Sequence, residues 1–545
     1  MRILAFSVAH DSSVCCLNNG EIEFFCKEER VSRKKRDQVP FKSLELFKEN
    51  VKGKIDHVLY CTPSNSQKDS ENIFSIYVKK IFNKHMENYS ELRHHDCHMA
   101  LAYSNSGFDE ALVFVIDRNG SSFFIDGFEV ARECESVYKV NRDSIKEIQK
   151  NFFITGPTNQ KHIIKENIKN YYNCEIVCDS EFSIVKVYEA ATSLIGQKPL
   201  ENGKTMGLSS YSDKDNFPKL FLDNIPVSEK FTGSVALGLG GTFFDSLDKL
   251  TNNVSENNYH YYADKAKHVQ TETQKEVLDL IKKHVEKTGI KNVCIVGGYG
   301  LNVVANNYYI KNLPEVNFYF EPTADDTGIS IGATFLKNFE ETNNWPHILQ
   351  NNFYHFYKPE EKLEGITKEL DDITDLLIKG KSVGIFEGNP EAGPRALGHR
   401  SILFDPRNKD AKNLVNKIKK REWYRPFAGI ILEEYFEDYF HTLGYKKSEY
   451  MTINFDAKTH TKDIVPGIIH VDNTCRIQTV NSGSLYELLK DFYNKTGCPM
   501  LLNTSLNLAG QPLVQTKNES IEILKTSNLD YIYFVEDKIL VEELL

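Results

Sequence analysis

The sequence predicts an α/β protein that combines a duplicated N-terminal domain with a C-terminal mixed α/β domain. Two units of one design, each a strand, an acidic turn and further strands, lie at residues 3–25 and 111–130 and indicate the duplication. Strands that alternate with helical patterns indicate the α/β class. A stretch without periodicity at 343–361 precedes a fresh series of elements, so we place the domains at residues 1–350 and 351–545.

The individual elements follow from apolar periodicity and turn residues. Apolar runs predict strands at 3–8, 14–17 and 22–25 in the first unit, and at 111–116, 122–125 and 128–130 in the second. A short helical run at 99–103, a helix at 272–284 and a buried strand at 293–296 complete the N-terminal part. In the C-terminal part the patterns predict strands at 383–386, 429–432, 468–471 and 531–535, and helices at 409–420 and 485–493.

Composition excludes several classes of protein. The chain has 545 residues, of which 41% are hydrophobic and 26% charged, and this balance excludes disordered, collagen-like and coiled-coil proteins. A formal net charge of −10 disfavours a dedicated duplex-DNA binder. The sequence has no run of 18 apolar residues and no secretory leader, and its eleven cysteines form no CxxC pair. We therefore predict a soluble, cytoplasmic protein with reduced thiols and no membrane partner.

A pair of histidines predicts a metal site. His94 and His98 are four residues apart, a spacing that places two side chains on one helix face. Asp117 ends a predicted strand and Asp326 lies in a second acidic turn, so both offer carboxylates. Imidazole and carboxylate ligands with open positions suit Fe(II), Mn(II) or Zn(II). Histidines at this spacing also occur as surface or capping residues, so the pair alone is weak evidence.

A second candidate is the turn at His10 and Asp11. In the functional interpretation His10 is a general base that a carboxylate orients, because histidine titrates near neutral pH. In the alternative interpretation, Asp11 only caps the turn. Glycine turns at 238–242 and 297–300 offer backbone amides to a phosphate or nucleotide, although such turns are common.

Arginine is unevenly distributed. The chain has 14 arginines, none of them between Arg142 and Arg395, and six lie from Arg395 to Arg476. Gly393-Pro394 presents Arg395 on a rigid backbone, and guanidinium groups suit phosphate oxygens. Convergent cations with Asn and Ser side chains favour a triphosphate or acyl-phosphate pocket over a structural network.

Taken together, these stretches resemble the O-carbamoyltransferase family, the nodulation-type and antibiotic-tailoring carbamoyltransferases. The resemblance covers essentially the whole chain in order. Its motifs are His10-Asp11-Ser12, His94-His95-x-x-His98, Lys204-Thr205-Met206-Gly207-Leu208, Gly297-Gly298-x-x-Leu301-Asn302, the run from Gly393 to Ser401, Arg425-Pro426-Phe427-Ala428, and Leu502-Asn503-Thr504-Ser505.

This resemblance implies a fold and a reaction. The N-terminal part is similar to the actin/hexokinase-like, metal-bearing domain of tRNA threonylcarbamoyl transferases, and the C-terminal part to threonylcarbamoyl-adenylate synthase. The C-terminal domain would use ATP with Mg²⁺ and carbamoyl phosphate to make carbamoyl-adenylate. The N-terminal domain would then pass the carbamoyl group to a hydroxyl of a small acceptor, such as a sugar, an antibiotic-like metabolite or a hydroxymethyl nucleotide.

The resemblance also implies roles for matching residues. One divalent metal, Fe²⁺ before Mn²⁺ or Zn²⁺, would be held by His94, His98, Asp117 and Asp326, and the catalytic residues would be His10 and Asp11. Nucleotide contacts in the N-terminal domain would come from Lys204, Gly207, Gly297, Gly298 and Asn302. ATP and carbamoyl phosphate would be bound by Arg395, Lys419, Arg425, Arg476, Asn503 and Ser505. One departure is Arg118, which stands where the family usually has glycine after the aspartate.

Other functions stay open at this stage. A second enzymatic hypothesis is carbamoylation of a hydroxymethylated pyrimidine, as a nucleotide or within DNA. The tRNA-modifying interpretation is weaker, because both halves are fused here in the O-carbamoyltransferase order. A non-catalytic nucleotide-binding switch is the alternative outside enzymes. A homo-oligomer is compatible with all of them.

Overall fold

The computed structural model describes residues 1–8, 10–62, 89–179, 183–198, 200–217, 231–234, 239–241, 254–346, 356, 363 and 365–542. The chain forms two compact units, each with its own sheets and core. The first unit comprises Met1–Glu28 and Arg36–Asn352, and the second comprises Glu29–Lys35 and Phe353–Leu545. A short segment close to the N-terminus of the sequence therefore belongs to the second unit.

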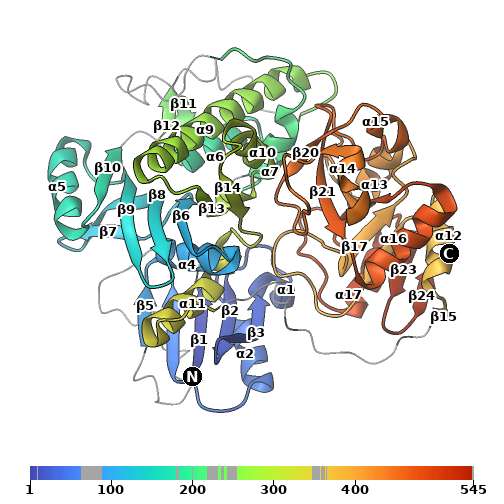
Figure 1. Cartoon of the computed structure of the whole chain (residues 1–545), viewed down its shortest axis with the longest axis horizontal. Coiled ribbons are helices and arrows are strands. Elements are labelled where there is room, and N and C mark those ends of the chain that lie inside the picture. The colour runs from blue at the N-terminus through green and yellow to red at the C-terminus, as the bar shows by residue number, and fades with distance from the viewer. Residues whose placement is uncertain are drawn as a thin grey trace. The chain divides into compact units, whose positions relative to one another are not determined.

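The first unit alternates strands and helices along the chain (Figure 1). Its strands are β1 (Arg2–Ser7), β2 (Ser13–Asn18), β3 (Glu21–Lys27), β4 (His57–Cys61), β5 (Tyr89–Leu92), β6 (Glu110–Ile116), β7 (Ser122–Ile125), β8 (Phe128–Asn141), β9 (Ile145–Ile154), β10 (Glu175–Asp179), β11 (Phe231–Ser234), β12 (Leu239–Gly241), β13 (Asn292–Val296) and β14 (Asn317–Phe320). Its helices are α2 (Phe41–Asn50), α4 (His94–Ser106), α5 (Lys161–Tyr171), α6 (Ile184–Leu194), α7 (Asn202–Ser209), α9 (Tyr259–Thr288), α10 (Val303–Asn312) and α11 (Ile329–Thr342), with 3-10 turns η1 (Thr158–Gln160), η3 (Gly298–Leu301) and η4 (Asp326–Gly328).

Two sheets of the first unit repeat one topology. The first sheet has the order β3-β2-β1-β4-β5, in which β3, β2 and β1 are antiparallel neighbours and β1, β4 and β5 are parallel ones. The second sheet contains the order β9-β8-β6-β13-β14 with the same sequence of directions, and β10 extends it beyond β9. The predicted duplicated α/β architecture is therefore confirmed.

One pairing in the second repeat differs from the prediction. The run at 122–125 was expected to be the middle strand of a meander, but β7 pairs only with the beginning of β8. The strand that pairs with β6 is the later part of β8, where Ile116 lies opposite Glu135. This part of β8 carries many polar and charged residues, so it lacked the apolar run on which the prediction relied.

Helices α4 and α11 pack against each other and against the two sheets. Helix α4 contacts β6 and β13 of the second sheet, whereas α11 contacts β1, β2 and β4 of the first. Their close approach requires glycine, because a Cβ atom on Gly332 would lie only 1.9 Å from the carbonyl oxygen of Cys97. This contact fixes the first turn of α4 relative to the segment that leads into α11.

The second unit is built on a mixed sheet with the order β15-β24-β23-β16-β17-β22-β18-β21-β20-β19. The strands are β15 (Ile366–Thr367), β16 (Val383–Phe386), β17 (Arg400–Phe404), β18 (Ala428–Leu432), β19 (Phe440–His441), β20 (Asn454–Ala457), β21 (Thr474–Val480), β22 (Met500–Ser505), β23 (Tyr531–Phe534) and β24 (Ile539–Glu542). The helices are α12 (Leu370–Ile378), α13 (Ala411–Lys419), α14 (Phe436–Tyr439), α15 (Thr461–Ile464), α16 (Gly483–Thr496) and α17 (Lys517–Thr526), with the 3-10 turn η5 (Glu433–Tyr435) and helix α1 (Glu28–Ser32), most of which belongs to this unit.

The strand predicted at 468–471 is wrong. This stretch forms turns, and the regular strand is β21, which begins at Thr474. Of its apolar residues, Ile468 is buried in the core from a turn, whereas Val471 is half exposed, so the apolar run does not correspond to a strand. Beneath the sheet, the core includes Phe386, Ile402 and Leu506.

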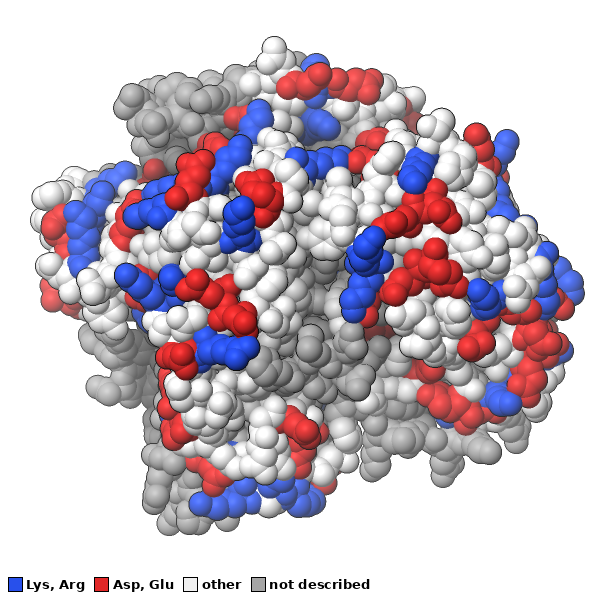
Figure 2. Space-filling view, viewed as in Figure 1, with Lys and Arg blue, Asp and Glu red and all other residues white. Residues whose placement is uncertain are grey.

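Three global features of the described residues bear on the class of protein. All eleven cysteines are free thiols in the structure, and ten of them are buried. No helix in the described ranges has the length and apolarity needed to cross a bilayer. On the face shown in Figure 2, basic and acidic side chains are interspersed over the described surface and form no continuous basic band.

Candidate functional site

The first unit holds a cluster of four metal-binding side chains. His94 and His98 lie in the first turns of α4, Asp117 follows β6 directly, and Asp326 begins η4. One ligand atom from each lies within 4.8 Å of the others, and all four residues are buried. The Nε2 atom of His94 is 3.4 Å from Asp117 Oδ2 and 3.4 Å from Asp326 Oδ1. The structure thus brings together the four residues that the sequence proposed as ligands.

The chemistry of this cluster fits a divalent cation. Nε2 of both histidines is buried without a hydrogen-bond partner among the described residues, which is costly unless something else binds it. Burial alone would favour neutral carboxyl groups, yet His94 and His98 lower the pKa of Asp326 well below its usual range. Burial alone would likewise lower the pKa of His94, but Asp326 and Asp117 raise it well above its usual value. Two ionised carboxylates and two imidazoles form a donor set for Fe(II), Mn(II) or Zn(II).

His10 lies beside this cluster, but Asp11 does not orient it. His10 Nδ1 is buried and lies 4.0 Å from Asp326 Oδ2, while a third of the side chain is exposed. Asp11 has a left-handed backbone, with φ of 66°, and its carboxylate pairs with Lys27 at 3.1 Å. The carboxylate that approaches His10 is therefore that of Asp326. The exposed atoms of the imidazole leave His10 accessible to a solute.

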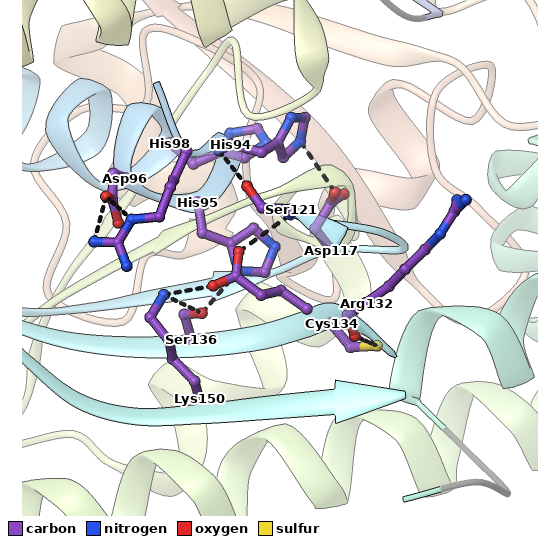
Figure 3. A network of polar contacts seen from close by, with 12 residues as sticks. His94, His95, Asp96, His98, Asp117, Ser121, Arg132, Cys134, Ser136 and Lys150 are labelled. Atoms are coloured by element: carbon purple, nitrogen blue, oxygen red, sulfur yellow. Dashed lines mark hydrogen bonds and ion pairs between the residues drawn. The ribbon is translucent and has the colours of Figure 1, made fainter. Parts of the chain in front are cut away.

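A buried polar network contacts the beginning of helix α4, which carries His94 and His98 (Figure 3). Ser121 Oγ accepts a hydrogen bond from the backbone N–H of His94 at 3.0 Å, and its own N–H donates to Glu133 at 3.1 Å. Glu133 pairs with the fully buried Lys150 at 2.8 Å, and Lys150 also donates to Tyr138. Although burial opposes it, Lys150 lowers the pKa of Glu133 to about 2. Sequence reasoning missed this network, because its members are scattered polar residues of β-strands.

Two glycines next to the cluster are required by close packing. Gly297 has φ of 88°, and a Cβ there would meet the carbonyl of Ile116 at 2.5 Å. The neighbouring Gly298 N–H donates to Asp117 Oδ1 at 3.1 Å and so orients this carboxylate. Gly120 lies against His95, whose Nε2 would be 2.5 Å from a Cβ. Glycine at these positions lets the turn after β6 approach the cluster.

The remaining residues predicted for nucleotide contacts in this unit have local partners. Lys204 of α7 pairs at 2.9 Å with Glu201, the residue that precedes this helix, and Gly207 is buried in the same helix. Asn302 caps α10 by accepting from Ala305 N–H at 3.1 Å, and it also exchanges hydrogen bonds with Gln270. Of the glycine turn at 238–242, Gly238 and Thr242 lie outside the described residues.

Arg118 turns toward α6. Its guanidinium group forms an ion pair with Glu189, which is almost fully buried. Its neighbour Asn119 accepts a hydrogen bond from Lys186 of the same helix. The long side chain at the usual glycine position is thus tied to α6 through Glu189.

Glu135 lies nearby on β8 and is expected to make stability depend on pH. Burial raises its pKa to about 7, although the N–H of Ile184 and the amide of Asn151 stabilise the carboxylate. Between about pH 4.5 and 7, the folded state keeps a proton on Glu135 that the unfolded state has already released. The free energy of unfolding therefore falls as the pH rises through that range. Relative to Glu135→Gln, we expect the wild-type free energy of unfolding to decrease by about 3 kcal/mol from pH 5 to pH 8.

Denaturant-unfolding midpoints of both proteins at several pH values measure this difference. Glu133→Gln is the control, because Glu133 stays ionised over this range and its replacement should lower stability equally at every pH. Parallel profiles for the wild type and Glu135→Gln would contradict the expectation.

The second unit holds a cluster of cations. Lys419 ends α13, Arg421 and Arg425 follow it, and Arg476 lies on β21. Burial, together with Arg421 and Arg425, lowers the pKa of Lys419 well below its usual value. Burial and the guanidinium groups of Arg395 and Arg425 do the same to the pKa of Arg476. Several positive charges close together in a setting of low polarity are compatible with an anion-binding site.

Polar side chains surround these cations. Lys419 Nζ donates to Ser505 Oγ at 3.0 Å and to Asn507 Oδ1 at 2.6 Å. Arg476 Nε is buried and lacks a hydrogen-bond partner among the described residues. Asn503 uses its amide nitrogen to bind the carbonyl of Ala396 at 3.0 Å, so this group holds the backbone next to Arg395. Ser505, Lys419 and Arg476 thus have the chemistry for phosphate oxygens.

Two arginines of the arginine-rich region serve the fold. Arg400 is fully buried, stacks 3.4 Å from the ring centre of Phe386, and donates to the carbonyl oxygens of Glu387 and Gly388. Arg407 pairs with Asp405 at 2.6 Å. The two terminal guanidinium nitrogens of Arg400 donate to backbone carbonyls and Arg407 pairs with a carboxylate, whereas Arg476 lies among other cations.

Comparison with known proteins identifies relatives of both units. The profile described as "Carbamoyltransferase N-terminus" matches residues 45–335, and "Carbamoyltransferase C-terminus" matches residues 374–542. An uncharacterized protein of Methanocaldococcus jannaschii is 29% identical over 97% of both chains. Nodulation protein NolO of Bradyrhizobium diazoefficiens is 26% identical over 81% of this chain and 77% of its own. Among solved structures, HypF of T. kodakarensis is similar with a TM-score of 0.40 and 12% identity, covering 63% of this chain and 48% of HypF.

Proposed function

The chain belongs to the carbamoyltransferase family and is a carbamoyltransferase, and on that premise we propose that it carbamoylates a hydroxyl group of a small acceptor at the expense of ATP. The observation that carries this proposal is that the two units offer two chemically different sites. The second unit gathers cations for phosphates, and the first gathers four metal-binding side chains beside His10.

The first half-reaction is assigned to the second unit. Carbamoyl phosphate, ATP and one water give carbamoyl-adenylate, pyrophosphate and phosphate. Arg395, Lys419, Arg425 and Arg476 bind the phosphate oxygens, and the charge that they carry in a buried setting strengthens this binding. Mg²⁺ accompanies ATP.

The second half-reaction is assigned to the first unit. The imidazole of His10 takes the proton of the acceptor hydroxyl as its oxygen bonds to the carbamoyl carbon. The bond from that carbon to the AMP oxygen breaks, and AMP leaves. A divalent cation held by His94, His98, Asp117 and Asp326, with Fe²⁺ as first choice on the family resemblance, would supply positive charge for oxygen atoms that become more negative. Nδ1 of the His10 imidazole lies 4.0 Å from Asp326 Oδ2, so His10 is next to this centre.

The acceptor is proposed to be a small molecule. A net charge of −10 and the interspersed charges on the face shown in Figure 2 offer little attraction to a nucleic-acid polymer. Mass spectrometry of sugars, aminoglycoside-like compounds and hydroxymethyl nucleotides after incubation with the enzyme, ATP and carbamoyl phosphate will identify the acceptor by an added carbamoyl group.

Separation of the two half-reactions gives a test. We expect the wild type to exchange labelled pyrophosphate into ATP only when carbamoyl phosphate is present. His10→Asn should keep this exchange within about twofold and lose transfer by about 100-fold or more, because a positioned general base contributes about 10²–10⁴. Without exchange in the wild type, the adenylate proposal fails, and equal loss of both activities in His10→Asn would contradict the assignment of steps to units.

A further inference from the structure

The loop from Glu391 to Arg400 presents Arg395 to the cation cluster of the second unit. Hydrogen bonds within the loop itself hold the half that follows Arg395. The buried carboxylate of Glu391 accepts hydrogen bonds from the backbone N–H groups of Leu397 at 2.6 Å, His399 at 2.9 Å and Arg400 at 3.2 Å. These bonds order the half of the loop that follows Arg395.

The half that precedes Arg395 is held by a residue from the beginning of the chain. Arg30, in helix α1, is 1% exposed and belongs with its segment to the second unit. Its Nη2 donates to the carbonyl oxygens of Glu391 at 3.1 Å and of Gly393 at 3.2 Å. Only Pro394 separates Gly393 from Arg395, and its ring restricts the backbone between them. The orientation of the Glu391 and Gly393 carbonyls therefore determines the position of the Arg395 Cα atom, from which its side chain extends.

We propose that Arg30 is a positioning residue of the phosphate site, because its guanidinium group fixes the Glu391–Gly393 turn and thereby aims Arg395 at the phosphates. This inference rests on the proposed function only for the identity of the substrates. Removal of Arg30 leaves the buried carbonyl of Glu391 and the partly buried carbonyl of Gly393 without this donor, and the turn shifts to reach other partners. A displacement of about 1 Å at such a group can cost about 100-fold in rate.

The test uses the full-length protein with Arg30→Met and Arg30→Lys. We expect Arg30→Met to weaken binding of inorganic pyrophosphate by about tenfold, measured by calorimetry, and to lower kcat/KM of carbamoyl-phosphate-dependent exchange by about 100-fold. Arg30→Lys keeps one charged donor and should recover part of both. A merely structural role would lower the unfolding temperature and leave pyrophosphate affinity of the folded protein unchanged.

Arg33→Lys is the matched control on the same segment. Arg33 donates to the carbonyls of Leu513 and Pro512 and pairs with Glu519, away from the Arg395 loop, so its replacement should change pyrophosphate affinity less than twofold. If Arg30→Met folds and binds pyrophosphate with wild-type affinity, the proposal is wrong. If Arg30→Met does not fold, wild-type pyrophosphate affinity in Arg30→Lys contradicts the proposal instead. If the wild type binds pyrophosphate but does not exchange it into ATP, only the proposed adenylate reaction is wrong. The pyrophosphate affinity of the Arg30 variants still tests the role of Arg30.

Discussion

Asp326→Asn should abolish metal binding and carbamoyl transfer while pyrophosphate exchange continues. Asp326 is the centre of the donor cluster, with Oδ1 at 3.4 Å from His94 Nε2 and 3.7 Å from His98 Nε2, and Oδ2 at 4.0 Å from His10 Nδ1. The amide keeps the shape of the side chain but loses its negative charge. We expect metal affinity to fall by about 100-fold or more, since even residues that only support metal ligands contribute about 10–100-fold.

Metal content by mass spectrometry and titration with Fe²⁺, Mn²⁺ and Zn²⁺ measure this loss. Asp325→Asn is the control, because it makes the same charge change one residue away, where the side chain only caps the turn by accepting from Thr327 N–H. Asp325→Asn should bind metal as the wild type does. Wild-type metal affinity in Asp326→Asn would remove the cluster from the proposed mechanism.

Arg476→Met should abolish pyrophosphate exchange and yet stabilise the protein. Arg476 lies among other cations, and its Nε has no hydrogen-bond partner in the described part of the chain. Its removal relieves repulsion with Arg395 and Arg425 in a setting of low polarity, where replacing charge by a similar apolar side chain often stabilises. We expect exchange to fall by about 100-fold or more and the unfolding temperature to rise by about 2 °C or more.

Adding pyrophosphate distinguishes the loss of anion binding from the change in stability in Arg476→Met. It should raise the unfolding temperature of the wild type, because a ligand of the folded state stabilises it, and should have little effect on Arg476→Met. Arg407→Met is the matched control, since Arg407 already pairs with Asp405, and it should gain no stability and keep exchange. A less stable Arg476→Met that retains exchange would indicate a structural arginine.

The sequence predicted most elements because their signals are local. Strands such as β16, at Val383–Phe386, are short apolar runs between polar turns, and the structure places β16 at those bounds. The errors arose where local and long-range preferences differ. Charged residues in the later part of β8 obscured a strand that pairing with β6 stabilises, and the apolar run at 468–471, of which only Ile468 is buried among the apolar residues, forms no strand.

Site residues were predictable to the extent that their geometry is local or their motif is familiar. The four-residue spacing of His94 and His98 places both imidazoles together in any helix. Asp117 and Asp326 have no such spacing relation to the histidines; as carboxylates of acidic turns they were candidates, and the family resemblance implied that all four residues hold one metal. Arg30 had no predicted role, because its partners at Glu391 and Gly393 lie more than 300 residues away along the chain.

By itself, the sequence determined the α/β class, the duplicated N-terminal design and the family, because repeated patterns and motifs are properties of the chain. Only the tertiary structure decided which neighbour each charge has. In the folded chain Asp11 forms an ion pair with Lys27, and the carboxylate beside His10 is that of Asp326. It also distinguished Arg400, whose terminal nitrogens donate to backbone carbonyls, from Arg476, which lies among other cations. Electrostatic energy depends on distance and burial, which exist only once the chain has folded.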